Sequence, residues 1–588
     1  MDCLLRQLGA KIRNKCSLKI HIRWTSSDAV VVDENPHVKG PFFVAAHASS
    51  GYCRAGLVND QGVIAKIAAT ATKMYQSGSF HEQSSDNVWN GLIHCIKKIT
   101  ENVPIADIKA ICFTSRPALV TVDKDGKSLT ASVSRDNSRN TIMHFDTRSY
   151  REAKLINQTH HSIIQYFGEL ILPELQESKV MWLKSHLFEE CWKNVGAFYD
   201  MTDYLTWRAT GSQTRSLSVL ISNWSYEITV NGNEGWNSRF FKEIGLEEME
   251  TDNWKVIGSS AQLPGKPAGE GLRENVAIEM GLTPGLPVAI SMLDQYASGL
   301  GLIGCKVEGI DEDITKRLCI AIGALGSSHF VLSHNPVFVK GVWGPFKGVI
   351  YPEMWLNQGG QTTSMGLVEY VVDKHPATST ITKRIGKMRI HKYLNKLLKV
   401  KAQQRNLKFI SYLTRDLHVL PDFNGNRSPL ADPLVRGAIS GLSLSDNQES
   451  LALMYLATLQ GITYGTKYIM DTMSHYGFNM NCVFLSGYLG ANSVFSHLHA
   501  DVCRMPVVCP HEPNSCLIGA AILGAVASNH YSSFNEATSA MGGTGKVFKP
   551  REDKELIDFH ARKYEVLMKM YEHQSLYRST MSNPMESH

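Results

Sequence analysis

The sequence lacks any apolar run near the length of a membrane helix. A membrane-spanning helix needs about 20 consecutive, mainly apolar residues, and polar residues interrupt every apolar stretch of the 588-residue chain before that length. The 12 cysteines are scattered, without a Cys-x-x-Cys pair and without a zinc-finger set of cysteines and histidines. These absences argue against a disulfide framework and a structural metal. We therefore expect no membrane partner, no bound metal of this kind, and reduced thiols in a cytoplasmic protein.

The chain also lacks a large excess of charge of either sign. The formal net charge is only +5, and basic residues do not gather into long runs with interleaved aromatics. This distribution argues against a nucleic-acid partner. The first two dozen residues differ, because six basic side chains there are opposed only by Asp2. We expect residues 1–40 to be a disordered basic leader, and a mitochondrial transit peptide is the alternative.

The chain is long enough for two large domains, because a single core usually stops growing at about 250 to 300 residues. Two similar pairs of apolar stretches around small-residue turns, at 42–57 and 318–332, are typical of β-hairpins. Helical periodicity at 87–100 and 450–473 lies between and after them. Alternating strands and helices predict an α/β fold, and the two hairpins predict a duplicated architecture.

Two further segments lead to structural expectations. The stretch 373–405 is polar, basic and broken by Pro376, so we expect a surface excursion. The tail 551–588 has apolar residues at roughly helical spacing before a polar end, so we expect it to pack back on the body.

One carboxylate stands out as a catalytic candidate. Asp294 ends an apolar run and is followed by small residues and two glycines, in the segment 291–302, Ser-Met-Leu-Asp-Gln-Tyr-Ala-Ser-Gly-Leu-Gly-Leu. A carboxylate among small apolar residues can accept a proton from a hydroxyl group. The alternative interpretation of Asp294 is a helix N-cap.

Other motifs stand with Asp294 in a recognisable order. They are Asp-Tyr-Leu-Thr-Trp-Arg-Ala-Thr-Gly at 203–211, Leu-Pro-Asp-Phe-Asn-Gly-Asn-Arg-Ser-Pro at 420–429, His-Glu-Gln-Ser-Ser at 81–85, Arg-Asn-Thr-Ile-Met at 139–143, Gly-Val-Trp-Gly-Pro at 341–345 and Trp-Leu-Asn-Gln-Gly-Gly-Gln at 355–361. Through them the chain resembles the FGGY carbohydrate kinases, most closely the ribulokinase-like members, over roughly residues 42–575.

The resemblance implies an α/β fold of two ribonuclease-H-like (actin-like ATPase) domains that face an interdomain cleft. The implied division is an N-terminal domain at 41–305, with the sugar side and the first phosphate hairpin, a nucleotide-side domain at 306–551, and a C-terminal helix and tail at 552–588. ATP and Mg²⁺ are the implied cofactors, and a small-molecule sugar or polyol is the implied partner.

The resemblance also implies roles for particular residues. The acid at the position of Asp294 takes the proton from the sugar hydroxyl. The implied substrate-binding positions are Asn223, Trp343, Gln358, Gly360 and Gln361. The implied nucleotide and phosphate positions are His47, Ser49, Ser50, Gly51, Arg54, Ala324, Leu325, Gly326, Gly487, Tyr488, Asn492 and Gly519.

Several of these positions depart from the family pattern. His47 replaces an acid that organises Mg²⁺ through water, and a neutral imidazole is a poor ligand for this hard cation. Leu325 replaces a hydroxyl residue and removes a phosphate donor, unless a one-residue slide brings Gly326-Ser327-Ser328 into register. Tyr488 either fills the adenine slot or stacks on its edge. Asn223 and Gln358 replace a lysine and a glutamate.

Two main functions follow from these observations. The first is ATP-dependent phosphorylation of a pentulose such as D-ribulose, or of a related polyol. The alternative is a catalytically impaired pseudokinase that acts as a binding or scaffold protein, because several lost electrostatic contacts of about 3 kcal/mol each compound quickly. A sugar sensor that binds no nucleotide is a third hypothesis.

Overall fold

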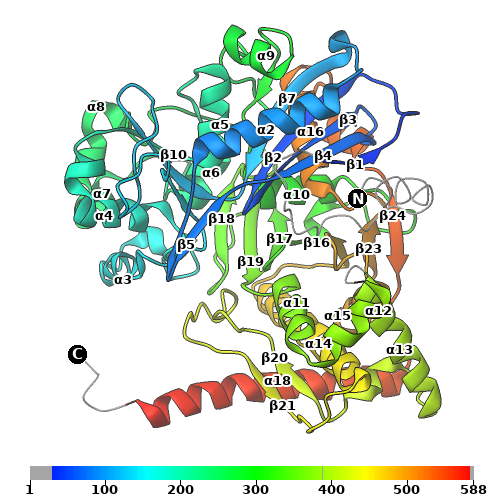
Figure 1. The fold of residues 1–588 in the computed structure, drawn as a ribbon. Helices are drawn as coiled ribbons and strands as arrows, with labels where there is room; N and C mark the ends of the chain where they lie inside the picture. Colours follow the sequence, from blue (N-terminus) through cyan, green and yellow to red (C-terminus); the bar gives the residue numbers. More distant parts are fainter. Residues whose placement is uncertain (1–29, 387–388, 583–588) are drawn as a thin grey trace.

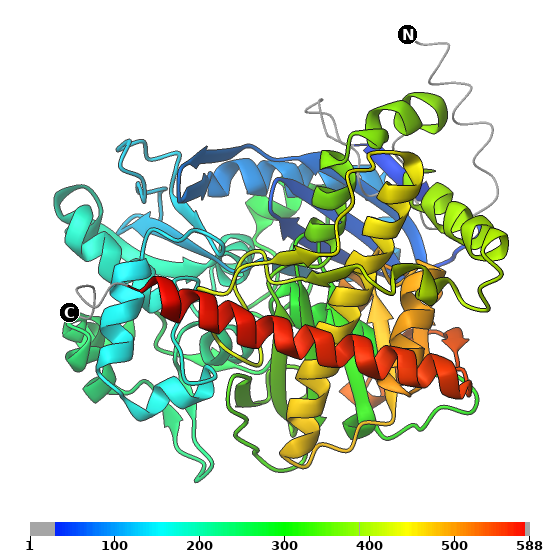
Figure 2. The same ribbon diagram turned by 90° about the horizontal axis from the view of Figure 1, so that it is seen from below.

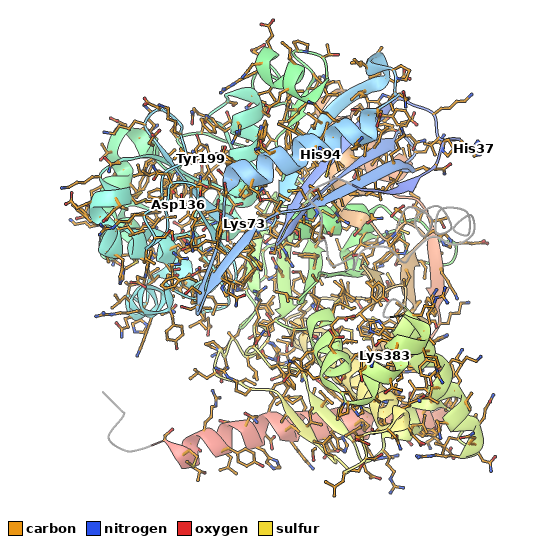
Figure 3. The ribbon with its side chains drawn as sticks, in the orientation of Figure 1. His37, Lys73, His94, Asp136, Tyr199 and Lys383 are labelled. Atoms are coloured by element: carbon orange, nitrogen blue, oxygen red, sulfur yellow. The ribbon has the colours of Figure 1, made fainter. Side chains whose placement is uncertain are left out.

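The computed structural model describes residues 30–386 and 389–582, which form two α/β lobes (Figure 1). Most of the expected basic leader lies outside the described residues. Figure 3 places His94 and Tyr199 in the upper lobe and Lys383 in the lower one. Within the described ranges, no helix combines the length and apolar character needed to cross a bilayer. The ten described cysteines are all buried and unpaired, as expected for reduced thiols.

The first lobe is built on a six-stranded sheet with the order β1-β4-β3-β2-β7-β15. Its strands are β1 (Val30–Glu34), β2 (Phe42–Ser49), β3 (Tyr52–Asn59), β4 (Ile64–Ala71), β7 (Ile108–Ser115) and β15 (Val288–Ala289). β2, β3 and β4 pair antiparallel, whereas β7 pairs parallel with both β2 and β15. The hairpin predicted at 42–57 is confirmed as β2 and β3.

The second lobe is built on a seven-stranded sheet with the order β18-β19-β17-β16-β22-β23-β24. Its strands are β16 (Arg317–Ile322), β17 (Ser327–Ser333), β18 (Trp343–Lys347), β19 (Trp355–Gln361), β22 (Cys482–Ser486), β23 (Val507–Pro510) and β24 (Gly545–Phe548). β16, β17 and β19 pair antiparallel, and β16, β22 and β23 pair parallel. This sequence of pairings repeats that of the first lobe, as a duplicated architecture requires.

Smaller elements complete the first lobe. A five-stranded sheet contains β10 (Val195–Asp200), β8 (Ala118–Asp123), β9 (Thr141–Met143), β6 (Phe80–Gln83) and β5 (Met74–Ser77). The further helices of this part of the chain are α3 (Tyr150–Gln158), α4 (Gln176–His186), α5 (Met201–Thr210), α6 (Leu217–Asn223), α7 (Ser238–Glu243), α8 (Thr251–Trp254) and α9 (Glu274–Met280). The helix predicted at 87–100 is α2 (Ser85–Thr100), which buries Val88, Leu92 and Ile96 and is capped by the Ser84 hydroxyl. Such a cap contributes about 1 kcal/mol.

Two helices are exchanged between the lobes. α10 (Asp294–Ile303) comes from the first half of the chain, yet its contacts with strands are mainly to β16 and β22 of the second sheet. α16 (Ser515–Ala527) comes from the second half and packs on β2 and β7 of the first sheet, where Figure 1 shows it in orange among blue strands. α10 and α16 also pack against each other, so the lobes meet along this pair.

The prediction of a surface excursion at 373–405 was wrong. The segment includes the end of α11 (Met365–Lys374), all of α12 (Ala377–Ile385) and all of α13 (Ile390–Gln404). Its apolar residues Ile381, Leu394 and Leu398 are buried in the core of the second lobe. The described Lys and Arg residues of α12 and α13 are exposed or half-buried, as expected on the outward faces of amphipathic helices.

Long helices cover the rest of the second lobe. α14 (Gln448–His475) confirms the helix predicted at 450–473, and α15 (Ser493–Cys503) packs against it. α18 (Lys554–Met581) confirms that the tail packs on the body, which it crosses as the red helix in Figure 2. Its buried Leu567 and Tyr571 join Leu420 and Tyr464 in one cluster. The remaining elements are β20 (His418–Leu420), β21 (Ala438–Ser440), α17 (Phe534–Met541) and the short pairs β11 (Arg215–Ser216) with β14 (Ala261–Gln262) and β12 (Glu227–Ile228) with β13 (Glu234–Gly235).

Candidate functional site

Asp294 is the first residue of α10 and lies where the two lobes meet. A short loop joins it to the end of β15, a parallel strand of the first sheet. Leu293 is the N-cap residue of α10. The residue is 8% exposed. Its Oδ1 atom is buried without a hydrogen-bond partner among the described residues. A buried carboxylate oxygen without a partner is costly, so this atom is suited to accept a hydrogen bond from a ligand.

The other oxygen of Asp294 is held by the first hairpin. His47 on β2 lies opposite Arg54 on β3. Nε of Arg54 donates to Nδ1 of His47 at 2.9 Å, and Nε2 of His47 lies 3.2 Å from Oδ2 of Asp294. Because Arg54 can only donate, Nδ1 of His47 is the acceptor and Nε2 carries the proton. His47 therefore donates to Asp294 as a neutral imidazole.

Arg116 approaches the same carboxylate from the end of β7. Its Nε lies 3.5 Å from Oδ2 of Asp294, and its backbone N–H donates to the carbonyl of Ala48 on β2. A Cβ atom at Gly323, in the turn of the second hairpin, would lie only 2.8 Å from Nη2 of Arg116. The Arg116 guanidinium thus reaches from the first lobe to the second. Arg54 is also tied to the second half of the chain, because its Nη1 donates to Asn514 at 3.0 Å, just before α16.

These charges set the protonation states of the site. Burial and then the Arg54 charge lower the pKa of His47 to about 4, so the ring is neutral at pH 7. Burial by itself raises the pKa of Asp294, but Arg116 and the hydrogen bond from His47 outweigh it and hold this pKa below its ordinary range. Burial and the charges of Arg116 and Lys179 lower the pKa of His144 well below its ordinary value. Asp294 is therefore the ionised group among these three.

A second polar group lies along α10 and the second sheet. The hydroxyl of Tyr296 donates to Oε1 of Gln358 at 2.6 Å, and that of Ser328 donates to Gln295 at 3.0 Å. Nε2 of Gln361 donates to the carbonyl of Ile462 on α14 at 2.9 Å. Gln358 is thus tied to the helix that begins with Asp294, whereas Gln361 is tied to the core of the second lobe.

Trp343 and Gly360 lie beside Arg427, which sequence reasoning did not single out. The guanidinium of Arg427 stacks over the Trp343 ring at 5.6 Å and forms an ion pair with Glu174 at 2.5 Å. A Cβ atom at Gly360 would lie 3.2 Å from Cδ of Arg427. Glycine at this position therefore leaves room for the arginine.

Asn223 belongs to a third, fully buried polar group. Its Nδ2 donates to Oδ2 of Asp200 at 2.7 Å, and Gln176 donates to the same oxygen at 2.8 Å. Lys179 is completely buried beside them, and burial lowers its pKa to about 8. The charges of both Lys179 and Asp294 act on the buried ring of His144.

The two hairpin turns hold most of the predicted phosphate positions. Ser49 is the last residue of β2, and Ser50 and Gly51 form the β2–β3 turn, with Gly51 at a φ of 86°. The Ser50 hydroxyl is buried and has no partner among the described residues, as suits a donor to a phosphate oxygen. Ala324, Leu325 and Gly326 lie in the turn between β16 and β17, where Leu325 is 46% exposed. Ser327 and Ser328 lie in β17, past the turn.

The predicted adenosine positions lie at the end of β22 and in α16. Gly487 has a φ of 85°, and a Cβ atom there would lie 2.3 Å from the Ile322 carbonyl. The half-buried Tyr488 packs against the core of the second lobe, and its ring centroid is 5.6 Å from that of His391 on α13. Asn492 caps α15. Gly519 lies in α16, and its missing Cβ admits the Ala297 carbonyl of α10.

The residues at this site do not fit a protein-held Mg²⁺ ion. Asp294 is the carboxylate at its centre, and the Oδ2 atom of Asp294 already faces His47 and the Arg116 cation. Mg²⁺ requires oxygen ligands, and both nitrogens of His47 are engaged. Across residues 30–386 and 389–582, no three His, Cys, Asp or Glu side chains gather in a way that could hold a metal.

Arg116, His144, Lys179 and Arg427 were missed by sequence reasoning. A signal existed for Arg116, which directly follows an apolar strand. Ligand sites in α/β sheets gather at the carboxyl ends of such strands. His144 directly follows the motif at 139–143. For Lys179 and Arg427 only the folded structure supplies the proximity.

Comparison with known proteins gives consistent relatives. The model of the FGGY family of carbohydrate kinases, N-terminal domain, matches residues 50–301, and that of the C-terminal domain matches residues 322–528. The chain is 39% identical over 553 residues to the FGGY carbohydrate kinase domain-containing protein of Homo sapiens, covering 92% of this chain and 98% of the human protein. It is 31% identical over 541 residues to a D-ribulokinase of Saccharomyces cerevisiae, covering 87% of this chain and 74% of the yeast protein.

Solved structures share the fold at low identity. The xylulose kinase of Rhodospirillum rubrum superposes with a TM-score of 0.71 at 16% identity, covering 91% of this chain and 99% of that one. A ligand-bound xylulose kinase of Lactobacillus acidophilus gives a TM-score of 0.73 at 14% identity, covering 92% and 100%. These likenesses confirm the predicted fold of two ribonuclease-H-like domains.

Proposed function

Because this chain belongs to the FGGY family of carbohydrate kinases, we propose that it phosphorylates a pentulose such as D-ribulose, or a related polyol, with ATP as the donor. The observation that carries the proposal is the state of Asp294. One of its oxygens is fixed by His47 and the other is buried without a partner among the described residues. An ionised carboxylate with one unused oxygen is suited to accept the proton of a sugar hydroxyl.

The polar groups around Asp294 support a polyhydroxylated substrate. The imidazole of His144, whose buried Nδ1 has no partner among the described residues, feels the charge of Asp294, and the amide of Gln358 bonds Tyr296 on the helix that Asp294 begins. An imidazole and an amide each offer both a donor and an acceptor. A sugar presents several hydroxyl groups that both donate and accept. The likeness to a yeast D-ribulokinase over most of the chain supports a pentulose.

The low pKa of Asp294 makes it a weak base. General-base catalysis is most efficient when the pKa of the base lies near the working pH, and Arg116 holds this pKa far below that. Leu325 also leaves the second hairpin without the hydroxyl that the family resemblance implies. We therefore expect slow turnover.

The test is ADP release by the purified protein with ATP, a divalent cation and a panel of ketoses and polyols that includes D-ribulose. Asp294→Asn should abolish sugar-dependent release, because an amide cannot take the proton, whereas Asp136→Asn should not change it. Asp136 is exposed on a loop of the first lobe (Figure 3). Equal release by the two variants would contradict the proposed role of Asp294.

A pseudokinase is the second candidate. The hydrogen bonds of His47 and the exposed side chain of Leu325 favour it. Both imidazole nitrogens of His47 are used within the protein, and an exposed isobutyl group occupies the second hairpin turn. This candidate predicts that no sugar stimulates ADP release and that Mg-ATP does not change the unfolding temperature. A micromolar dissociation constant for Mg-ATP would exclude it.

A further inference from the structure

The candidate site carries an excess of positive charge where a divalent cation would be expected. Arg54 and Arg116 are permanent cations, His47 is neutral, and Asp294 is the carboxylate that faces them. His47 lies on β2, Arg54 on β3 and Arg116 at the end of β7, and β2 lies between the other two strands. Three adjacent strands therefore present two guanidinium groups around one carboxylate.

Arg116 has hydrogen-bonding capacity to spare. Its closest charged partner is Asp294, at 3.5 Å, and within residues 30–386 and 389–582 its guanidinium makes no hydrogen bond to another side chain or carbonyl. The side chain is 20% exposed, so a ligand can reach it. A guanidinium has five N–H donors, and those of the two Nη atoms remain for a ligand.

The groups beside Arg116 also fit an anion. The Ser50 hydroxyl is buried without a partner within the described residues, in the hairpin turn that follows Ala48, to which the Arg116 backbone is bonded. The Nη2 atom of Arg116 faces the turn of the second hairpin at Gly323. A phosphate between the two turns would meet a hydroxyl donor from one side and guanidinium donors from the other.

We propose that Arg116, assisted by Arg54 and Ser50, forms a metal-independent binding site for a phosphomonoester dianion between the two hairpins. Guanidinium groups bind phosphate oxygens in pairs, with shorter and stronger hydrogen bonds than neutral donors make. The arginine supplies the positive charge that a divalent cation would otherwise bring. The choice of a sugar phosphate as the ligand rests on the proposed function. The recognition of its phosphate group rests on the positions of Arg116, Arg54 and Ser50.

Calorimetry in the presence of EDTA tests the site, with D-ribulose 5-phosphate and inorganic phosphate as separate ligands. The intact protein should bind the sugar phosphate without metal. Binding of inorganic phosphate as well would show that phosphate recognition needs no sugar. Arg116→Gln should weaken binding at least about tenfold, as loss of charge-assisted hydrogen bonds predicts.

Two further variants make the experiment selective. Arg116→Lys keeps the charge but loses paired hydrogen bonding, so it should bind with intermediate affinity and serves if Arg116→Gln does not fold. Arg415→Gln is the matched control, because the Arg415 side chain is 84% exposed and pairs with the neighbouring Asp416; it should bind like the unmodified chain. Binding that requires Mg²⁺, or unchanged binding by Arg116→Gln, would overturn the proposal.

The outcomes separate this site from the proposed function. Binding of sugar phosphate in EDTA without any ADP release would support the phosphate site and contradict the kinase activity. ADP release without binding of either ligand in EDTA would support the kinase activity and contradict the phosphate site.

Discussion

His47 determines the character of the site at the scale of single residues. Its ring accepts a hydrogen bond from Arg54 and donates one to Asp294. The resemblance leads one to expect an acid here that organises Mg²⁺, but His47 instead donates a hydrogen bond within the protein. Replacing the ring by a carboxylate would put two acids side by side, and like charges raise the pKa of one of them. The identity of this residue therefore controls both metal affinity and the basicity of Asp294.

His47→Asp should introduce a response to Mg²⁺. Two adjacent carboxylates offer the anionic oxygen ligands that the site lacks, and a ligand that binds only the folded state raises the unfolding temperature. We expect MgCl₂ to raise the unfolding temperature of His47→Asp but not that of the unmodified chain. His47→Asn, neutral and similar in size, is the control. An equal response of both variants to MgCl₂ would show that the carboxylate is not the cause.

Sequence reasoning at this scale singled out Asp294, His47 and Arg54, but it did not single out Arg116. Asp294 is marked by its local surroundings, an apolar run before it and small residues after it. Arg116 is distant in sequence from both Asp294 and His47, and only the pairing of β7 with β2 brings it to them. Proximity of this kind depends on strand order, which no local pattern contains.

Elements are predictable from sequence where their periodicity is regular. Both hairpins and the helices α2, α14 and α18 show regular apolar patterns, and these predictions are confirmed. The segment 373–405 misled because its many Lys and Arg residues are opposed by a single acid, Asp373, and because Pro376 interrupts it. Buried apolar side chains attach both helices to the core: Ala377 and Ile381 on α12, and Ile390, Leu394 and Leu398 on α13.

α4 carries a buried acid, Glu177, in its first turn. Glu177 is 1% exposed, and neither carboxylate oxygen has a hydrogen-bond partner within the described part of the chain. Burial raises the pKa of Glu177 from 4.5 to about 7. A folded-state pKa above the unfolded one means that the stabilising effect is complete below pH 4.5 and is lost as the pH rises through 7.

Glu177→Gln should therefore stabilise the protein in alkaline solution. The shift corresponds to at most about 3 kcal/mol of unfolding free energy at pH 8, and the gain should vanish near pH 4.5. Urea unfolding at pH 5 and pH 8 measures the difference. Glu308→Gln, at an exposed position, should change stability little at either pH. A gain that is equal at both values would assign the effect to packing instead of ionisation.

The whole molecule depends on how closely α10 and α16 approach. A Cβ atom at Gly519 would lie 1.8 Å from the Ala297 carbonyl, and one at Gly301 would lie 2.1 Å from the Ser515 carbonyl. Backbone contacts this close leave no space for a methyl group on either helix. The sequence shows the glycines, but not that one of these helices packs on the sheet of the other half.

Gly519→Ala should destabilise the protein by about 1–3 kcal/mol, as expected for overpacking of a filled interior. Gly524→Ala is the control in the same helix. Its added methyl would meet Ala110 Cβ at 3.4 Å, an ordinary contact, and alanine favours helix by up to about 1 kcal/mol. Thermal unfolding of the two variants should shift in opposite directions. Equal shifts would mean that the contact with Ala297 relaxes freely.

The exchange of α10 and α16 also limits how the gene can be divided. A fragment that ends near residue 305 would leave the β2–β7 face without α16, and the complementary fragment would leave β16 and β22 without α10. Each half would expose an apolar sheet face and would be prone to aggregate when expressed alone. Co-expression of both pieces supplies each truncated half with its missing helix.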